Sequence, residues 1–200
     1  MSESHTPQRP LILGSTSRYR RELVERLNLP FTTVSPEVDE TPLPGEAPGA
    51  LALRLALAKA HAVAAMHPEA IVIGSDQVSD LNGQPMGKPG THERAVEMLR
   101  AMRGQTVMFH TAVAVVCQAT GFAQSDVAVI RTVFRSDLSD DAIERYLRAE
   151  QPYDCAGSAK SEGLGISLLD AIHSDDPTAL IGLPMIRTCR MVRAAGIALP

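Results

Sequence analysis

The sequence predicts an α/β fold, in which helices pack against a sheet of buried strands. Two short, continuously apolar runs, Leu11–Gly14 and Ala70–Gly74, are typical of buried strands and are separated by helical patterns. The longer runs 107–117 and 122–134 flank a short turn at 119–121, which predicts an antiparallel hairpin. Since no repeat, low-complexity stretch or linker interrupts the 200 residues, we expect a single unit with room for two lobes.

Caps and prolines define the elements of the first third. Ser17 is a good helix N-cap, because its hydroxyl can accept a free backbone N–H, and the helix should run to about Leu27. Residues 31–35 predict a second strand. The proline- and glycine-rich stretch 36–49 predicts a loop, and Pro48 opens a nearly all-apolar, mostly buried helix that reaches Met66.

The later elements follow from the same signals. Asn82-Gly83 predicts a hairpin turn, and 155–165 is a glycine-rich loop. This loop is not a phosphate-binding Walker A loop, because Lys160-Ser161 lacks the preceding glycine and no strand leads into it. Helical periodicity and strand-like runs predict the remaining elements: helices 91–102, 139–149 and 183–195, and a strand 166–172.

Charge and composition exclude several classes of protein. The net charge is −4 with no basic block, which argues against a nucleic acid polymer as partner but allows a small polyanion bound by local positive charge or a metal. The sequence contains no run of about 18 apolar residues, so we expect no membrane partner. Residues 1–9 are expected to form a loose polar tail without a signal core. Three separated cysteines without a CxxC pair indicate reduced thiols in a cytoplasmic protein.

The stretch 14–21 combines features of an anion site. Ser15, Thr16 and Ser17 supply hydroxyls at a helix start, where free N–H groups favour a bound anion. Arg20 and Arg21 are unfavourably placed by the helix dipole alone, and a bound phosphate would resolve that conflict. A solvated basic first turn is the alternative interpretation.

Further charged residues stand at positions suited to a cleft. In the acidic loop, Glu40 and, more weakly, Asp39 are candidate metal ligands, whereas Glu46 is expected to be solvated. Lys59 lies about 140° from the polar stripe of its helix, so its ammonium should point into a cleft rather than lie along the surface. Asp76 is predicted to follow the end of a central strand, where open α/β sheets place their chemistry, although turn capping is a frequent alternative.

Read in order, these signatures resemble the Maf family of nucleoside triphosphate pyrophosphatases. The resemblance covers residues 11–190 and is carried by the following set: Ser15-Thr16-Ser17-x-x-Arg20-Arg21, Glu37-x-Asp39-Glu40, Lys59, Gly74-Ser75-Asp76-Gln77, Gly87-Lys88-Pro89, Ala156-Gly157 and Gly182-Leu183-Pro184. No single motif is specific, but the ordered set is.

The resemblance implies a mixed sheet with flanking helices and two lobes around a central cleft, as in the inosine triphosphate pyrophosphatases, with residues 10–200 forming one catalytic domain. It implies hydrolysis of a nucleoside triphosphate to the monophosphate and pyrophosphate with Mg²⁺ or Mn²⁺. Position by position, it assigns phosphate contacts to Ser15, Arg20 and Arg21, metal contacts to Glu40 and Asp76, proton acceptance to Asp76, and charge neutralisation to Lys59 and Lys88. Elementary chemistry agrees, since phosphoryl transfer needs mainly positioning and charge neutralisation.

At three positions, Tyr19, Gln77 and Glu162, the chain resembles the family branch that acts on 7-methyl-GTP. The resemblance implies a role in clearing modified nucleotides. A tyrosine face attracts the charged 7-methylguanine ring, and a carboxylate can accept two adjacent N–H groups of guanine. The alternatives are a dTTP/UTP pyrophosphatase of the same family and a non-catalytic nucleotide-binding regulator of cell division. Without the family, Glu162 would read as an exposed loop charge. Oligomeric state stays open, with a homodimer retained as an option.

Overall fold

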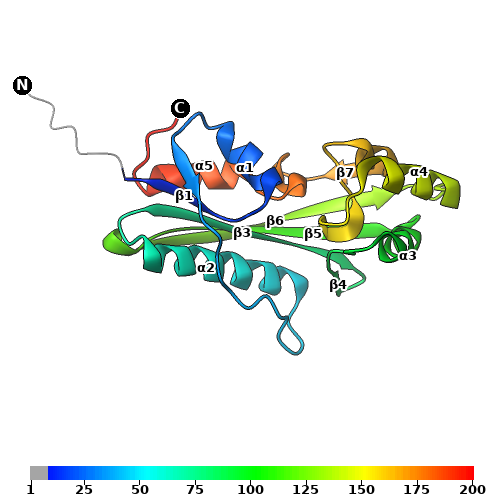
Figure 1. The fold of residues 1–200 in the computed structure, drawn as a ribbon, viewed down its shortest axis with the longest axis horizontal. Helices are drawn as coiled ribbons and strands as arrows, with labels where there is room; N and C mark the ends of the chain where they lie inside the picture. Colours follow the sequence, from blue (N-terminus) through cyan, green and yellow to red (C-terminus); the bar gives the residue numbers. More distant parts are fainter. Residues whose placement is uncertain (1–8) are drawn as a thin grey trace, which may run out of the picture.

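The structure, a computed structural model, describes residues 9–200. The predicted loose tail, residues 1–9, lies outside the described residues except for Arg9, whose guanidinium donates a hydrogen bond to the carbonyl of Glu69 at 3.2 Å. The prediction of an α/β fold is confirmed: helices cover both faces of a seven-stranded mixed sheet (Figure 1).

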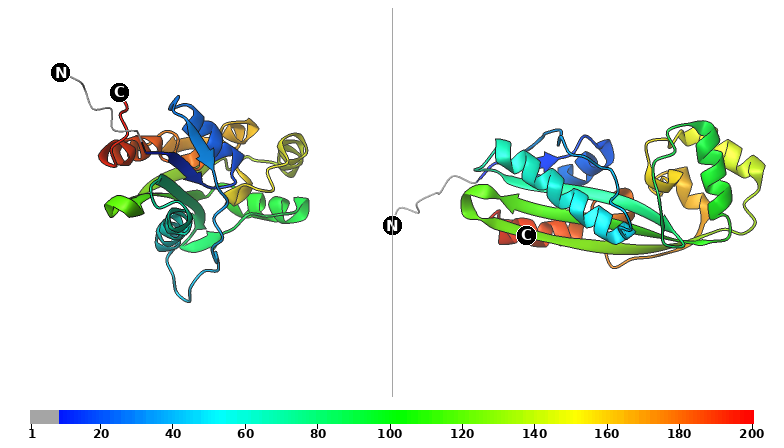
Figure 2. Two further views of the ribbon diagram at one scale, coloured as in Figure 1. Left: turned by 60° about the vertical axis from the view of Figure 1, so that its left-hand side comes forward. Right: turned by 90° about the horizontal axis from the view of Figure 1, so that it is seen from below.

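The sheet has the strand order β2-β1-β3-β5-β6-β7, with β4 paired to β3 at the side of this path. Strands β1, β2 and the first part of β3 are parallel, and the other pairings are antiparallel. The strands have the following bounds: β1 Leu11–Gly14, β2 Phe31–Thr33, β3 Ile71–Leu81, β4 Gln84–Met86, β5 Thr106–Cys117, β6 Phe122–Phe134 and β7 Leu169–His173. The long strands β3, β5 and β6 run the length of the molecule and join its two ends (Figure 2).

Three helices cover the first lobe and two belong to the second. Helix α2 packs on one face of the sheet, while α1 and α5 lie on the other; α3 and α4 lie at the far end (Figures 1 and 2). The helices have the following bounds: α1 Arg18–Glu25, α2 Pro48–Met66, α3 His92–Met102, α4 Asp140–Glu150 and α5 Met185–Ala194. Short 3₁₀ turns occur at Gln118–Thr120, Ala156–Ser158, Leu164–Leu168 and Ala179–Ile181.

The core divides in the way that strand periodicity requires. Alternate residues of a strand point to opposite faces, so Ile12 and Val72 pack under α2, whereas Leu13 and Ile73 pack under α1 and α5. A third apolar cluster, which contains Phe109 and residues of α3 and α4, forms the second lobe. The expected two-lobed architecture is therefore present in the described residues.

Helix α2 is long and apolar enough, by length and composition alone, to span a membrane. One such helix is weak evidence, since core helices of globular domains pass the same test. Its residues Ala52, Ala56, Ala60 and Val63 are buried against the sheet, as those of a core helix are.

Two strand predictions need correction. Strand β3 does not end at Gly74 but continues to Leu81, because β5 keeps an antiparallel partner beside it after β1 has ended at Gly14. Asp76 therefore lies within a strand and not after one. Residues 166–168 belong to a 3₁₀ turn, and β7 begins only at Leu169, where pairing with β6 becomes available. The predicted Asn82-Gly83 hairpin turn is confirmed, with positive φ at both residues.

Candidate active site

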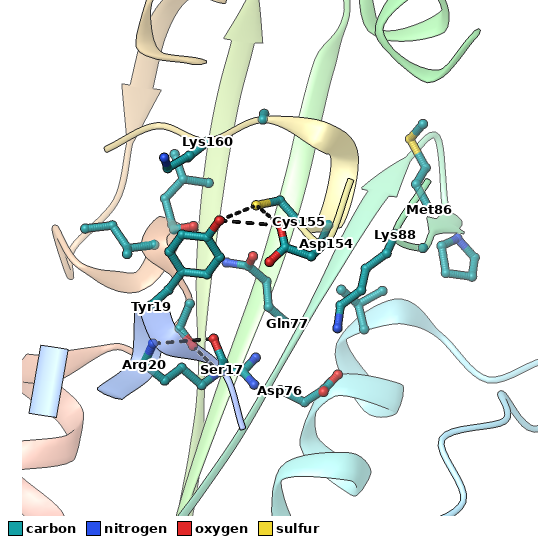
Figure 3. Close-up of a pocket in the computed structure, with 18 of the residues that line it drawn as sticks. Ser17, Tyr19, Arg20, Asp76, Gln77, Met86, Lys88, Asp154, Cys155 and Lys160 are labelled. Atoms are coloured by element: carbon teal, nitrogen blue, oxygen red, sulfur yellow. Dashed lines mark hydrogen bonds between the residues drawn. The ribbon is translucent and has the colours of Figure 1, made fainter. Parts of the chain in front are cut away.

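A cleft between the lobes opens where β1 stops and β3 continues. It consists of two adjoining cavities of about 380 and 390 Å³, which we call the nucleoside cavity and the phosphate cavity from the roles proposed below. Seven residues line both cavities: Ser17, Tyr19, Arg20, Glu40, Lys59, Lys88 and Asp154. Figure 3 shows several of these side chains converging on one space from elements far apart in the sequence.

Lys59 and Asp76 form the buried centre of the cleft. The ammonium of Lys59 lies 2.7 Å from Asp76 Oδ1 and 2.6 Å from Glu40 Oε1. Desolvation raises the pKa of Glu40. The Lys59 hydrogen bond and the charges of Lys59, Lys88 and Arg20 together lower this pKa more, so its net value is below the ordinary one. Lys59 is 6% exposed and Asp76 8% exposed. The prediction that Lys59 points into a cleft is thus confirmed.

The position of Lys59 depends on a close approach of α2 to β3. At Gly74, a Cβ atom would lie 2.6 Å from the backbone nitrogen of Ala60 and would collide with the carbonyl oxygen of Ala56. Glycine is therefore required at this crossing. The missing side chain lets α2 lie directly on β3, so that Lys59 of the helix can reach Asp76 of the strand.

Arg20 and two serines occupy the turn between β1 and α1. Ser17 caps the helix, as predicted, by accepting the backbone N–H of Arg20 at 3.4 Å. The guanidinium of Arg20 donates to the carbonyl oxygen of Gly182 at 2.8 Å and to Ser15 Oγ at 3.4 Å. Burial lowers the pKa of Arg20, with Asp76 and Glu40 opposing the shift. This arrangement directs Arg20 into the cleft beside the serine hydroxyls.

Three predicted placements are corrected by the structure. Arg21 does not line the cleft: it lies about 100° around α1 from Arg20 and pairs with Glu25 at 3.0 Å on the exposed surface. Asp39 also lies outside the cleft and accepts the backbone N–H of Thr41. Glu46 is not a solvated charge, because its carboxylate makes two hydrogen bonds to Arg54, at 2.6 and 2.8 Å, and its side chain is 8% exposed.

The three predicted specificity residues all line the nucleoside cavity. The guanidinium of Arg18 covers one face of the Tyr19 ring at 4.7 Å from the ring centroid. Gln77 donates its amide N–H groups to Thr111 Oγ1 and to the carbonyls of Ala179 and Leu180, at 2.9 to 3.0 Å. Its amide oxygen therefore points away from these groups.

Glu162 enters the cavity from the irregular segment after α4. Desolvation raises its pKa, and the nearby charges of Glu150 and Glu22 act in the same direction. The segment is held by Glu150, which accepts hydrogen bonds from the Lys160 ammonium at 2.7 Å and from the backbone N–H of Leu164 at 2.8 Å.

Sequence reasoning missed Asp154 and Cys155, which also line the cleft. The Cys155 thiol donates to the Tyr19 hydroxyl at 3.5 Å, and burial raises its pKa to about 11. Cys155 is the first residue of the predicted glycine-rich loop 155–165 and Asp154 directly precedes it, but neither lies in a helix or strand. That loop was the one available signal, and it does not single out these two residues.

The carboxylates of the cleft fit a magnesium or manganese ion. Among residues 9–200 no group of three or more His, Cys, Asp or Glu side chains forms a self-contained metal cage. Mg²⁺ in triphosphate sites is usually held by one or two carboxylates together with substrate phosphates and water. Glu40 and Asp76 satisfy this requirement, because both carboxylates converge on the same ammonium.

Fold and cleft together define an α/β protein with a paired lysine and acid at the centre of a cleft. The phosphate cavity of this cleft is lined by four basic and two acidic side chains, which suits a phosphorylated small molecule. The model of the Maf-like protein family matches residues 10–195, and the chain belongs to the Maf family.

Curated relatives span nearly the whole chain. A protein of Polaromonas sp. named 7-methyl-GTP pyrophosphatase is 71% identical over 191 residues, which cover 96% of this chain and 87% of the relative. Proteins of the same name from Albidiferax ferrireducens and Aromatoleum aromaticum are 66% and 60% identical over 190 residues each. These alignments cover 95% of this chain in both cases, and 95% and 97% of the respective relatives.

Proposed function

We propose that this chain hydrolyses 7-methyl-GTP to 7-methyl-GMP and pyrophosphate. The observation that carries the proposal is the meeting of Lys59, Asp76 and Glu40 in a cleft also lined by Arg20 and Lys88. The shared name of the curated relatives supports the choice of substrate.

In the proposed mechanism, Asp76 accepts a proton from a water molecule that attacks the α-phosphorus. The bond between the α-phosphorus and the bridging oxygen to the β-phosphorus breaks, and pyrophosphate leaves. Lys59 orients the Asp76 carboxylate through a contact of 2.7 Å. A general base must be held in position close to the water from which it takes a proton.

The triphosphate chain lies in the phosphate cavity in this proposal. Ser15 offers a hydroxyl, and Arg20 and Lys88 offer positive charge from the two sides of the cleft. Arg20 is held in place by its bonds to Gly182 and Ser15, so it loses little freedom when it binds a phosphate. Arg21 is omitted from the proposed site because it lies on the outer surface of α1.

Glu40 and Asp76 would hold the divalent ion. When bound with the triphosphate, such an ion neutralises phosphate charge and orients the reacting groups. The pKa of Glu40 lies below its ordinary value, so this carboxylate is ionised and ready to serve as a ligand at neutral pH.

The nucleoside lies in the nucleoside cavity, beside Tyr19 and Glu162. Arg18 covers one face of Tyr19, so the methylated base meets the other face. Glu162 accepts the adjacent N–H groups of the guanine edge. The amide N–H groups of Gln77 are already bound to the carbonyls of residues 179 and 180, which they hold in place. Only the amide oxygen of Gln77 is therefore left to contact the base.

The reaction would remove a modified nucleotide from the cellular pool. The described cysteines, Cys117, Cys155 and Cys189, are all free, which is typical of the reducing cytoplasm. We accordingly place the reaction there.

Pyrophosphate release from a panel of triphosphates tests the proposal. With Mg²⁺ present, we expect kcat/KM for 7-methyl-GTP to exceed that for GTP, UTP and dTTP. Preference for UTP or dTTP would assign the chain to the other branch of the family. Tight nucleotide binding without release of pyrophosphate would make it a nucleotide-binding regulator instead.

A further inference from the structure

We propose that the carboxylate of Asp154 binds the ribose hydroxyls of the substrate and makes the protein selective for ribonucleotides. This inference rests on the proposed function and deepens it. It assigns a role to an acidic residue that the proposed mechanism leaves unused.

The position of Asp154 is the first argument. It is one of the seven residues that line both cavities, whereas Glu162 lines the nucleoside cavity alone. In a nucleotide, the ribose joins the base to the phosphates. A nucleotide that fills both cavities would therefore place its sugar near their junction, which Asp154 helps to line. Figure 3 shows the Asp154 side chain beside Cys155 at the wall of this space.

Charge is the second argument. Of the four carboxylates that line the nucleoside cavity, Glu40 and Asp76 are paired with Lys59. Within residues 9–200, no Lys, Arg or His nitrogen lies within 4 Å of Asp154. An unpaired carboxylate close to a triphosphate repels it. Such a residue is tolerated where the ligand offers hydrogen-bond donors, and the donors of a nucleotide at this point are the sugar hydroxyls.

The existing contacts of Asp154 leave its oxygen atoms available. The Tyr19 hydroxyl donates to Asp154 Oδ1 at 3.4 Å, and the Cys155 thiol approaches the same atom at 3.6 Å. Both are long contacts that stronger donors can displace or supplement. Acceptance of ribose hydroxyls by an acidic side chain is also a recurrent solution in nucleotide-binding folds.

The backbone around Asp154 is hydrogen-bonded to a neighbouring turn. The N–H of Gly90 donates to the carbonyl of Tyr153 at 3.0 Å, and the N–H of Gly157 donates to the carbonyl of Gly87 at 3.4 Å. These bonds tie the segment to the Gly87-Lys88-Pro89 turn. The carboxylate of Asp154 and the ammonium of Lys88 thus belong to one connected wall of the cleft.

The test compares ribonucleotides with deoxyribonucleotides. We measure kcat/KM of the wild-type protein, Asp154→Asn and Asp154→Ala on 7-methyl-GTP and on its 2′-deoxy and 3′-deoxy forms. The wild-type protein should prefer the ribonucleotide over at least one deoxy form by about tenfold or more, the usual effect of a hydrogen bond to a charged group. The ratio should fall toward one in Asp154→Ala and take an intermediate value in Asp154→Asn, whose amide oxygen still accepts but carries no charge.

Glu162→Gln is the matched control, because it alters a carboxylate in the same cleft that we assign to the base. Its ribose preference should equal that of the wild-type protein, while its preference for 7-methyl-GTP over UTP falls. Thermal melting checks that all variants are folded. A folded Asp154→Ala that retains the wild-type ribose preference, or a wild-type protein without any, overturns the proposal.

Two further outcomes are distinguishable. If Asp154→Ala instead loses discrimination between 7-methyl-GTP and GTP, the carboxylate faces the charged base and the ribose assignment is wrong. If the wild-type protein releases no pyrophosphate, the proposed function is wrong, but the ribose contact of Asp154 can still be tested. Calorimetric dissociation constants for 7-methyl-GMP and its deoxy forms then decide the ribose contact, with the same expected ratios.

Discussion

The two halves of the cleft are built differently. By the phosphate side we mean the proposed reaction centre, where Lys59, Arg20 and the adjoining Asp76 project from helices and a central strand; Lys59 and Asp76 are buried and paired. On the nucleoside side, Glu162, together with Asp154 at the junction of the two cavities, projects from the irregular segment between α4 and β7, and both residues are exposed. The groups that we propose to act on the reacting phosphorus are thus fixed by the core, whereas the groups that we propose to select the substrate are carried by a loop. This is the division expected when one scaffold serves several specificities.

Removing the Asp76 carboxylate should nearly abolish turnover. We expect Asp76→Ala and Asp76→Asn to lower kcat by about 10²- to 10⁴-fold, the usual range for loss of a general base. The measurement is pyrophosphate release from 7-methyl-GTP, with thermal melting as the check on folding.

Asp80→Asn is the control for the acid. Asp80 is on the same strand, four residues further along, but it pairs with His110 and does not line the cleft. Its kcat should stay near that of the wild-type protein. Near-wild-type turnover in both Asp76 variants would remove Asp76 from the mechanism.

A methyl group at Gly74, where α2 crosses β3, should disturb the packing that positions Lys59 and Asp76. We expect Gly74→Ala to destabilise the protein by about 1–3 kcal/mol or more, because the new Cβ collides with the backbone of α2. Urea unfolding measures the change. Gly87→Ala is the matched control, since a Cβ there meets nothing within 4 Å. Equal stability of the two variants would contradict the close packing of α2 on β3.

Changing the loop carboxylate should sharpen the contrast, because selectivity should move while the reaction persists. We expect Glu162→Gln to lower kcat/KM for 7-methyl-GTP by about tenfold or more, with a much smaller loss on UTP. Uracil offers a single N–H between two acceptors, which an amide can serve as well as a carboxylate. Equal losses on both substrates would count against this assignment of the pocket.

The smallest expected effect concerns the acidic loop that carries Glu40. Hydrogen bonds from Arg54 and from the backbone N–H of Leu43 lower the pKa of Glu46 to about 2. Because the folded-state pKa lies below the ordinary value of 4.5, this contact stabilises the protein above about pH 4.5 and is lost as the pH falls toward 2.

Thermal melting between pH 7 and pH 2 tests this contact. Glu46→Gln should melt slightly below the wild-type protein at pH 7, with the difference vanishing at the acid end. Glu37→Gln, at an exposed position of the same loop, should melt like the wild-type protein throughout. A constant difference for Glu46→Gln across the whole range would show that its charge plays no part.

The regular elements were largely predictable because their signals are local. Ser17, Thr91 and Ser139 cap helices α1, α3 and α4, and Pro48 opens α2 at the predicted residue. The continuation of β3 past Gly74 was not predictable in this way. It depends on pairing with β5, whose partner residues lie 28 to 38 positions further along the chain.

Site residues divide along the same line. Lys59 could be placed in a cleft because an unpaired lysine on the apolar side of a helix has few alternatives. The sequence did not show which of the two adjacent arginines faces the cleft. Arg20 does so because it donates to the carbonyl of the distant Gly182, whereas Arg21 pairs with Glu25 on the outer surface. Asp154 left no pattern at all.

By itself, the sequence determined the α/β class, the caps and turns, the ordered motifs of a Maf family member, and most of the charged residues of the cleft. Periodicity, capping and residue chemistry act over a few positions and are written into the chain directly. The tertiary structure alone decided which carboxylates meet Lys59, which arginine turns inward, and that Asp154 stands at the junction of two cavities. Those outcomes depend on contacts between residues that are distant along the chain and become neighbours only when the two lobes pack on one sheet.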